Sequence, residues 1–139
     1  MSIFEYSPKQ ILAAKNMHTS LRREVHRLHA EICQALSDPT RILILYELRD
    51  GAKKVGELAE MTGTTQPTVS RHLKILRERR MVIAEREGTT VYYRLADDRV
   101  IQALDLLRAM LARSLEDHRA VVAEMAEGLP QLSDLTLST

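Results

Sequence analysis

The side chains from Thr65 to Lys74, TQPTVSRHLK, could do chemistry on the edges of nucleic-acid bases. At about 100° per residue, Val69 and Leu73 fall on one side of a helix and Arg71 and Lys74 on the other. Arginine can donate two hydrogen bonds to guanine, glutamine can pair with adenine, and threonine can contact the thymine methyl group. The pattern therefore favours a helix that reads bases, and an ordinary amphipathic surface helix is the alternative.

Positive charge is concentrated around this segment. Residues 66–94 contain seven Lys or Arg against three acidic residues, whereas the whole chain has a net charge of only +1. A local basic surface on a near-neutral chain suits a polyanionic partner, although such clusters are often only solvated faces. His72 falls at the edge of the apolar side of the wheel, so packing is its expected role.

The elements around the segment predict a helix-turn-helix. A short helix is expected over Val55–Met61 and ends at Gly63; Thr64 or Thr65 then caps a helix that starts at Gln66-Pro67 and runs to about Arg79. Three or four residues between two helices, with Gly in the turn, is the spacing of this motif.

A β-hairpin follows the second of these helices. The runs Met81–Arg86 and Thr90–Leu95 are rich in Val, Ile, Thr and Tyr, and Gly88 lies in the short connection between them. Such a hairpin forms a wing that can lie along the DNA backbone or in the minor groove. Arg86 lies beside its tip and Arg94 near the end of the returning strand, and Arg86 is the residue that we expect to bind there. A purely structural wing is the alternative.

The flanking segments predict the remaining helices. Ser7-Pro8-Lys9-Gln10 begins a first helix that runs to about Leu36, with a break near Asn16–Ser20 left open. Ser37-Asp38-Pro39 starts a second helix that Gly51 closes, and Asp97 caps a long last helix that ends near Gly128, before a frayed tail. The expected fold is mainly α with a small β-hairpin: a winged helix-turn-helix with four helices, two strands and a fifth helix.

Apolar stripes on the long first and last helices predict a dimer. The last helix carries more apolar positions in register than a winged-helix core needs, and pairing with a second copy would cover the excess. The expected dimer contacts are Leu21, Val25 and Leu28 of the first helix, and Leu104, Leu107, Leu111, Leu115 and Val122 of the last.

Three segments together resemble the ArsR/SmtB family of winged-helix repressors. They are ALSDPTRILILYEL, VGELAEMTGTTQPTVSRHLKILRERRMV and REGTTVYYRL. The resemblance covers about residues 24–118, between an N-terminal helical extension (residues 1–23) and the end of the last helix with its tail (residues 119–139). It implies a homodimer that binds a palindromic operator on double-stranded DNA and releases it when an inducer binds, with first and last helices packed across the dimer. By position it implies DNA contacts at Thr65, Gln66, Thr68, Ser70 and Arg71, and the helical wheel adds Lys74.

The family's metal sites are not reproduced here. Cys33 is the only cysteine, so a three-thiolate arsenic-type site within one protomer is impossible, and the positions that match the zinc ligands are Val100, Leu111 and Ser114. A stripe of His26, His29 and Cys33, with His118 approaching from the last helix, could supply zinc-like ligands. Cys33 could instead pair with its mate across a dimer, but a polar flank with Cys33 as a small buried residue is the expected reading. We assign no metal or cofactor.

Length and composition bound the function. The 139 residues suit one domain, no apolar run approaches a membrane span, and the N-terminus lacks the features of a signal peptide, so a cytoplasmic protein is expected. The sequence has no phosphate loop, activated nucleophile or paired-carboxylate signature, so no enzyme is predicted. The prediction is a homodimeric DNA-binding regulator, a repressor that a metal, redox or small-molecule signal releases. The alternative is a winged-helix interaction or scaffolding module that does not read DNA sequence.

Overall fold

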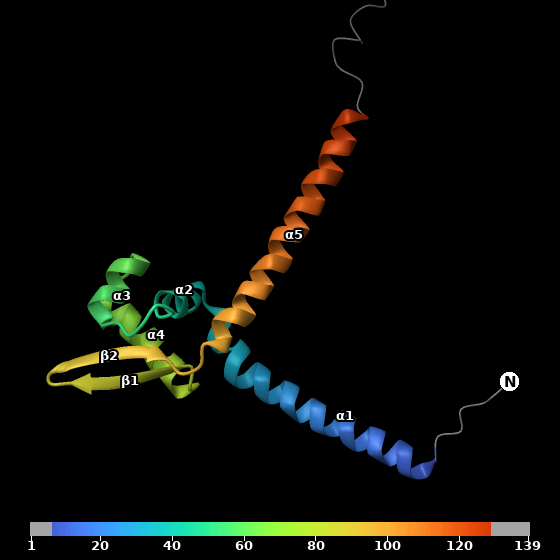
Figure 1. Ribbon diagram of the computed structural model, residues 1–139, viewed down its shortest axis with the longest axis horizontal. Coiled ribbons are helices and arrows are strands. Elements are labelled where there is room, and N and C mark those ends of the chain that lie inside the picture. The colour runs from blue at the N-terminus through green and yellow to red at the C-terminus, as the bar shows by residue number, and fades with distance from the viewer. Residues whose placement is uncertain (1–6, 129–139) are drawn as a thin grey trace, which may run out of the picture. The chain divides into compact units, whose positions relative to one another are not determined.

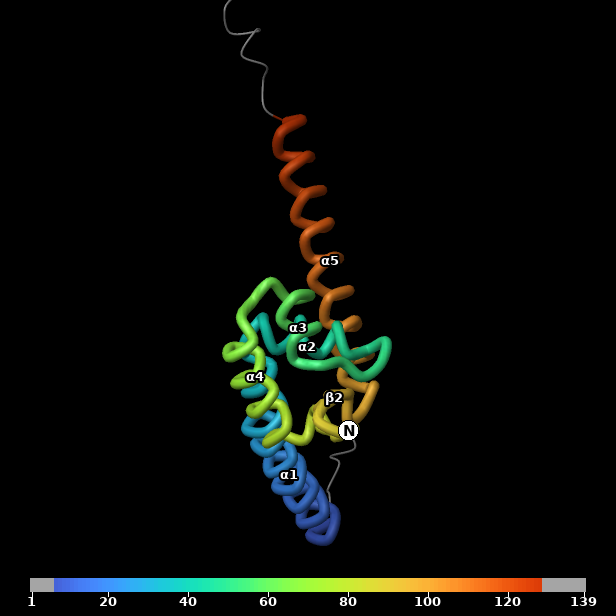
Figure 2. The backbone as a smooth tube through the Cα atoms, turned by 90° about the vertical axis from the view of Figure 1, so that its left-hand side faces the viewer, coloured from blue at the N-terminus to red at the C-terminus, as the bar shows by residue number. Residues whose placement is uncertain are grey.

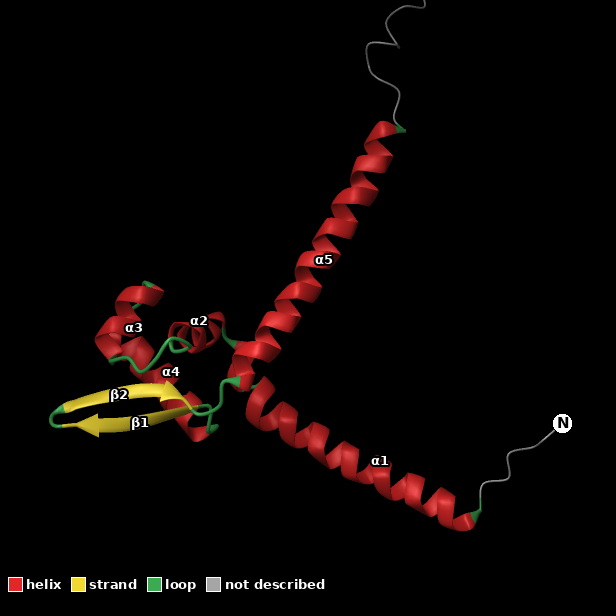
Figure 3. Ribbon diagram, in the orientation of Figure 1, coloured by secondary structure: helices red, strands yellow, loops and turns green. Residues whose placement is uncertain are grey.

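The computed structural model describes residues 7–128 of the chain. Its elements are α1 (Pro8–Leu28), a π-helical turn η1 (His29–Cys33), a 3-10 turn η2 (Ala35–Ser37), α2 (Pro39–Glu47), α3 (Val55–Thr62), α4 (Gln66–Glu78), β1 (Val82–Glu87), β2 (Thr90–Leu95) and α5 (Arg99–Glu127) (Figure 1, Figure 3). This order confirms the predicted winged helix-turn-helix. The chain forms two compact units that divide between Asp98 and Arg99. The family-based boundaries at residues 23 and 118 are a different division and stay a prediction.

Helix α1 begins as predicted but ends earlier. Ser7 and Gln10 form a reciprocal capping box, and the helix runs without a break through residues 16–20. The prediction of one helix to Leu36 was wrong, because the backbone changes to π-helical at His29 and to 3-10 at Ala35. No Gly or Pro marks this change, so no local pattern predicts it.

Helix α2 also starts as predicted and ends earlier. The Asp38 carboxylate accepts a 2.8 Å hydrogen bond from the Thr40 backbone N–H and so caps the helix, with Pro39 in the first turn. Gly51 was expected to close this helix, which was wrong: the helix ends at Glu47 and its C-cap is Leu48. Gly51 instead belongs to the turn that follows, where its φ is 137°.

The helix-turn-helix between α3 and α4 is confirmed. Gly63 caps the C-terminus of α3 with φ 67°, a left-handed conformation in which glycine has no steric penalty. Two residues later, the Thr65 hydroxyl caps α4 by accepting from the Thr68 backbone N–H. The sequence left Thr64 and Thr65 open as caps, and the structure selects Thr65.

The core lies where α2, α3 and α4 gather with the hairpin (Figure 2). The predicted inward residues of α4 are buried, and they pack with apolar residues of the neighbouring helices. The largest buried side chains are Ile44, Leu45, Leu48, Leu58, Val69, Leu73 and Leu76. This core fixes the opposite side of α4 as the side that faces solvent.

Strands β1 and β2 form an antiparallel hairpin with Val82 opposite Leu95 and Glu87 opposite Thr90. The turn is therefore two residues, with Gly88 at φ 62°. A bridge of two backbone hydrogen bonds, 2.9 and 2.8 Å long, joins Lys53 to Tyr93. This bridge ties the hairpin to the chain just before α3, so the wing and the helix-turn-helix belong to one framework.

A strained arginine, Arg80, follows the C-cap of helix α4. Arg80 has φ 59°, and the hydrogen bonds from Arg80 N to Arg77 O and from Met81 N to Leu76 O, both 2.9 Å, complete a Schellman-type cap in which glycine is usual. A left-handed conformation costs a residue with a Cβ about 1–2 kcal/mol.

We expect Arg80→Gly to stabilise the protein by about 0.5–1 kcal/mol. Glycine relieves the strain in the folded state, and the greater conformational entropy of the unfolded chain offsets only part of this gain. The measurement is the free energy of urea-induced unfolding. Arg79→Gly is the matched control: Arg79 has φ −88°, so glycine there is expected to destabilise. Equal effects of the two changes would show that the cap geometry is not the cause.

Helix α5 is long and mostly exposed: it runs from Arg99 to Glu127, and Leu104 is its buried residue. Its predicted end near Gly128 is confirmed. Its predicted cap, Asp97, lies two residues before Arg99 and stays a prediction. The tail lies outside the described residues. Within residues 7–128, no helix combines the length and hydrophobicity that a membrane span requires.

Candidate nucleic-acid interface

The outward side of α4 presents the polar side chains that the sequence predicted. Gln66, Ser70, Arg71 and Lys74 are exposed and Thr68 is half-buried, while Val69 on the inner side is buried. Within the described residues, neither the Arg71 nor the Lys74 side chain has an ion pair or hydrogen bond. Both cations are therefore available to an external partner.

The first turn of α4 is internally organised. The Thr65 hydroxyl donates to the Thr68 hydroxyl over 2.8 Å while it caps the helix, so its hydrogen-bonding capacity is largely used. The Gln66 side chain lies over Gly56 of α3, where an added Cβ would come within 3.4 Å of Gln66 Nε2. The Thr65–Thr68 contacts therefore order the start of α4, from which the exposed Gln66 projects.

His72 is the buried polar residue of α4, at 7% exposure. Its Nδ1 lies 3.2 Å from an Arg41 guanidinium nitrogen, and its Nε2 lies 4.0 Å from Asp38 Oδ1. Because arginine only donates, Nδ1 must be the acceptor and the ring proton lies on Nε2, toward Asp38. The expected packing role of His72 is confirmed, but the sequence did not predict these two polar partners.

Electrostatics keep His72 neutral and Asp38 charged. Burial lowers the pKa of His72, and the nearby Arg41 and Arg71 charges lower it further, against an opposing effect of Asp38. For Asp38, desolvation raises the pKa. The backbone N–H groups of Thr40 and Arg41, the Arg41 charge, and the His72 charge when that ring is protonated together outweigh it, so the net pKa is below the usual value.

These shifts predict a loss of stability in acid. Both folded pKa values are lowered, so the unfolded chain binds the proton first: His72 from about pH 6.5 downward and Asp38 from about pH 3.8 downward. The contribution of His72 to stability is therefore fully present above pH 6.5 and is lost as the pH falls through its folded pKa. Urea unfolding of wild type and His72→Asn from pH 7.5 to 5 tests this, and the variant is expected to lose less. Parallel profiles would contradict the prediction.

On the wing, the two predicted strand arginines differ. Arg94 Nε donates to Glu85 Oε1 over 2.7 Å, so its charge is balanced within the hairpin. Arg86 is exposed next to the tip and has no ion pair among the described residues. The geometry supports the choice of Arg86 over Arg94.

Two cations that the sequence reading did not single out belong to this region. Arg41 contacts the inner side of α4 through His72, and in the sequence it stands out only as part of the segment ALSDPTRILILYEL. Lys54, the residue before α3, is exposed, and its Nζ lies 5.7 Å from the centre of the Tyr92 ring. The adjacent pair Lys53-Lys54 is the sequence feature that could have indicated this exposed cation.

The suggested effector residues do not assemble into a site in the described part of the chain. No group of three His, Cys, Asp or Glu residues between positions 7 and 128 is placed to hold a metal ion. The stripe of His26, His29 and Cys33 was drawn on an α-helical wheel, and the π-helical turn from His29 changes that angular spacing. Cys33 is exposed, which corrects the expectation of a buried residue.

Comparisons with known proteins agree with this geometry. A family model described as "Bacterial regulatory protein, arsR family" matches residues 38–84. The transcriptional regulator CmtR of Mycobacterium tuberculosis is 42% identical over 98 residues, which are 70% of this chain and 81% of CmtR. KmtR of the same species is 44% identical over 75 residues, 54% of this chain and 58% of KmtR. The chain spans 56 to 63% of the length of three such relatives, KmtR, NmtR and SmtB.

One solved structure is similar to this chain in both fold and sequence. It is the solution structure of the homodimeric winged helix-turn-helix DNA-binding domain of a possible ArsR-family transcriptional regulator from Mycobacterium bovis. The likeness has a TM-score of 0.58 and 29% identity, and it covers 84% of this chain and 96% of that one. The described order of elements, the matched helix-turn-helix and the CmtR similarity over most of both chains lead to one conclusion: the chain belongs to the ArsR family of bacterial regulatory proteins.

Proposed function

We propose that this protein is a homodimeric, sequence-specific DNA-binding regulator, most simply a repressor. The observation that carries the proposal is the outward side of α4, where the Arg71 and Lys74 side chains are exposed and unpaired among the described residues, beside the hydrogen-bonded Thr65 and Thr68 hydroxyls and the exposed Gln66 amide. The relatives named as transcriptional regulators or repressors support the same role.

Helix α4 docks in the major groove by its N-terminal half. There Gln66, Thr68 and Arg71 reach base edges, while Ser70 and Lys74 hold phosphates. Backbone N–H groups of the first turn add a favourable field for a phosphate. Arg86 on the wing contacts the backbone beside the groove, and Lys54 before α3 is a further cation on the same framework.

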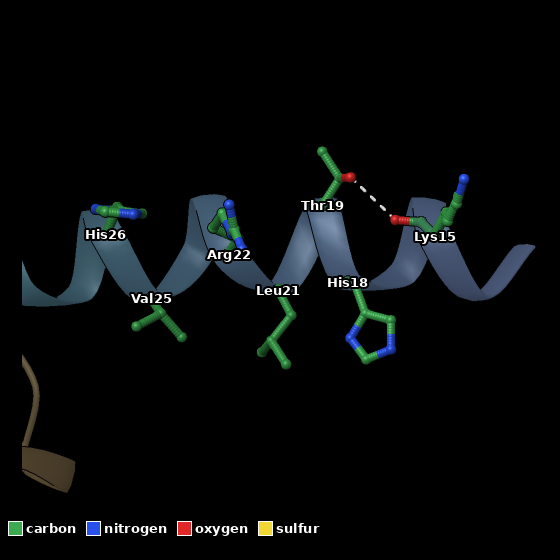
Figure 4. A pocket seen from close by; sticks show the side chains of 7 residues that line it. All are labelled: Lys15, His18, Thr19, Leu21, Arg22, Val25 and His26. Carbon is green, nitrogen blue, oxygen red and sulfur yellow. Dashed lines mark hydrogen bonds between the residues drawn. The ribbon is translucent and has the colours of Figure 1, made fainter. Parts of the chain in front are cut away.

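The exposed stripe on α1 is proposed as one part of the dimer interface. Leu21, Val25 and Leu28 are each slightly more than half exposed in the single chain. Figure 4 shows Leu21 and Val25 on the same side of α1 as His18, with Arg22 and His26 turned away. The hollow along this helix is lined by α1 residues alone and is open to solvent, which leaves room for a helix of the second copy.

The stripe on α5 is proposed as the other part. Leu107 is 57% and Leu111 62% exposed, and Leu115 and Val122 are also more than half exposed. Leu104 is the exception, because it is 6% exposed in the single chain and therefore has no surface to offer a partner. Water-exposed leucines repeating along one side of a long helix favour pairing with a second copy.

Twofold symmetry gives the operator its form. Two copies of α4 would contact two half-sites about one turn of DNA apart, so the operator is expected to be a palindrome. The homodimeric winged helix-turn-helix from Mycobacterium bovis supports this assembly. As a DNA-binding regulator the protein acts in the cytoplasm, without an enzymatic step.

Release from the operator is proposed to follow a metal, redox or small-molecule signal. His26, His29, Cys33 and His118 stay the residues to test first, with the second copy supplying any ligands that one chain lacks. Replacing Cys33 with alanine tests both the metal and redox proposals. If operator affinity still responds to zinc or peroxide as in wild type, Cys33 has no part in sensing.

The experiment that tests the function starts from a random DNA duplex library, from which the protein selects its preferred sequence. Affinity for that duplex and for a scrambled one is then measured by fluorescence anisotropy from about 50 to 300 mM salt, a range that brackets physiological ionic strength. We expect a clear preference for the selected duplex and a logarithmic salt slope steeper than about −4, since each phosphate contact adds about −0.9. No preference with a shallow slope would support a protein-interaction module instead.

A further inference from the structure

Arg41 joins three parts of the fold through one guanidinium group. Its Nε donates to the Ala35 carbonyl over 2.6 Å, and a terminal nitrogen donates to the Gln34 carbonyl over 3.3 Å. The other terminal nitrogen donates to Nδ1 of His72 over 3.2 Å. We call this set of contacts the Arg41 bridge; it runs from the segment after η1 to the inner side of α4.

At one end of the bridge, the positive Arg41 guanidinium group lies beside carbonyl oxygens that carry partial negative charge. Carbonyls at the end of a helical segment have no partner within the helix and carry partial negative charge, so a cation there is favourable. Gln34 and Ala35 lie at the change from the π-helical turn to the 3-10 turn, where regular bonding is interrupted. Arg41, from the first turn of α2, donates to both carbonyls. The Gln34 carbonyl also accepts from the Ser37 hydroxyl over 2.7 Å and from the Ser37 backbone N–H over 3.3 Å.

The His72 end of the bridge gives α4 a directional contact. Val69, Leu73 and Leu76 hold α4 by apolar packing, which is strong but not directional. Within the described residues, the Arg41–His72 contact is the side-chain hydrogen bond that joins α4 to another element. A hydrogen bond depends on angle as well as distance, so it limits rotation and sliding of α4.

We propose that Arg41 and His72 are positioning residues for base recognition: their bridge sets where α4 lies relative to the end of the first helical segment. The inference rests on the proposed DNA-reading function. His72 immediately follows Arg71 in the chain, so a shift of His72 moves the outward guanidinium with it. A displacement of about 1 Å is enough to spoil a bidentate base contact, while flexible phosphate contacts tolerate it.

Protonation of His72 should change the Arg41 bridge in a way that can be measured. The groups that face the His72 ring are Asp38 and Arg41 from the start of α2 and Arg71 from α4 itself. Neutral His72 accepts from Arg41 at Nδ1, whereas protonated His72 has no acceptor and turns toward Asp38 as its charge partner. Acid therefore breaks the bridge without removing a cation from the outward side of α4.

The test uses four variants of the full chain. Arg41→Gln and His72→Leu remove the bridge; Arg41→Lys keeps the charge without the forked geometry; His72→Asn keeps an acceptor near the position of Nδ1. For each, the ratio of affinities for the selected and scrambled duplexes is measured under conditions where the variant is folded and dimeric. Unfolding free energy is measured separately.

We expect Arg41→Gln and His72→Leu to lower this ratio by about tenfold or more, the loss typical of a hydrogen bond to a charged group. The salt slope should stay close to wild type, since the phosphate contacts remain. Arg41→Lys should lower the affinity ratio as much as Arg41→Gln and His72→Leu do. His72→Asn should keep most of the wild-type ratio. Wild-type discrimination should weaken below the pKa of His72, and that of His72→Asn should not.

An unchanged ratio in folded Arg41→Gln and His72→Leu would overturn the inference, even if both lose stability, because the bridge would then be structural only. Equal pH profiles for wild type and His72→Asn would also overturn it. Failure of the proposed function looks different: wild type itself would then show no preference for any selected duplex.

Discussion

Arg71→Ala is expected to lower the preference for the selected operator about 10- to 100-fold and to relax base choice at one position of each half-site. The reason is that a bidentate arginine–guanine contact discriminates against other bases by about 1–3 kcal/mol. Arg71 is exposed, unpaired within the described residues, and lies on the outward side of the first two turns of α4. Repeating the selection with the variant measures the change.

Lys74→Ala is the matched control on the same side of the same helix. A phosphate contact carries no base information, so this change should weaken all duplexes about equally and reduce the salt slope by about 1 for each lost contact. Arg71→Lys keeps the charge without the fork and should resemble Arg71→Ala in selectivity. If Arg71→Ala and Lys74→Ala gave the same uniform loss, Arg71 would be a phosphate ligand.

Leu111→Glu is expected to abolish the dimer at micromolar concentration and to reduce operator affinity by about 100-fold or more. A carboxylate on this stripe must either lose its hydration in the interface or keep the two copies apart. With the copies separate, binding at one half-site no longer raises the local concentration at the other, a gain of about 10²–10⁴. Sedimentation equilibrium and anisotropy measure the two effects.

Leu106→Glu is the control for this change. Leu106 is also on α5 and exposed, but it lies off the stripe of Leu107, Leu111 and Leu115 on the helical wheel. The variant should remain dimeric and keep most of its operator affinity. A dimer that survives Leu111→Glu and dissociates with Leu106→Glu would move the interface to the other side of α5.

The sequence predicted what depends on local pattern. The repeat of Val69, Leu73 and Leu76 placed the core side of α4, because helix period and hydrophobic burial act over one element. Gly63 marked the turn, because left-handed backbone favours glycine. The outward side of α4 followed directly from these two features.

The parts that were missed depend on contacts between distant residues. Arg41 meets His72 across 31 positions in the chain, and no periodicity links them. The π-helical turn at His29 carries no glycine or proline, so an uninterrupted helix was the natural expectation. Leu104 and Leu111 are seven residues apart and have the same place in the α5 repeat, yet Leu104 is 6% and Leu111 62% exposed, a difference that the repeat alone does not predict.

Interference by guanine N7 methylation on the selected operator tests the central proposal most directly. N7 lies in the major groove, so a methyl group there blocks a helix that reads that edge. If two copies of α4 read the operator, binding should be lost at two symmetric clusters of guanines about one helical turn apart. Methylation that leaves binding unchanged, or that interferes at a single cluster, would contradict a dimer reading DNA through α4.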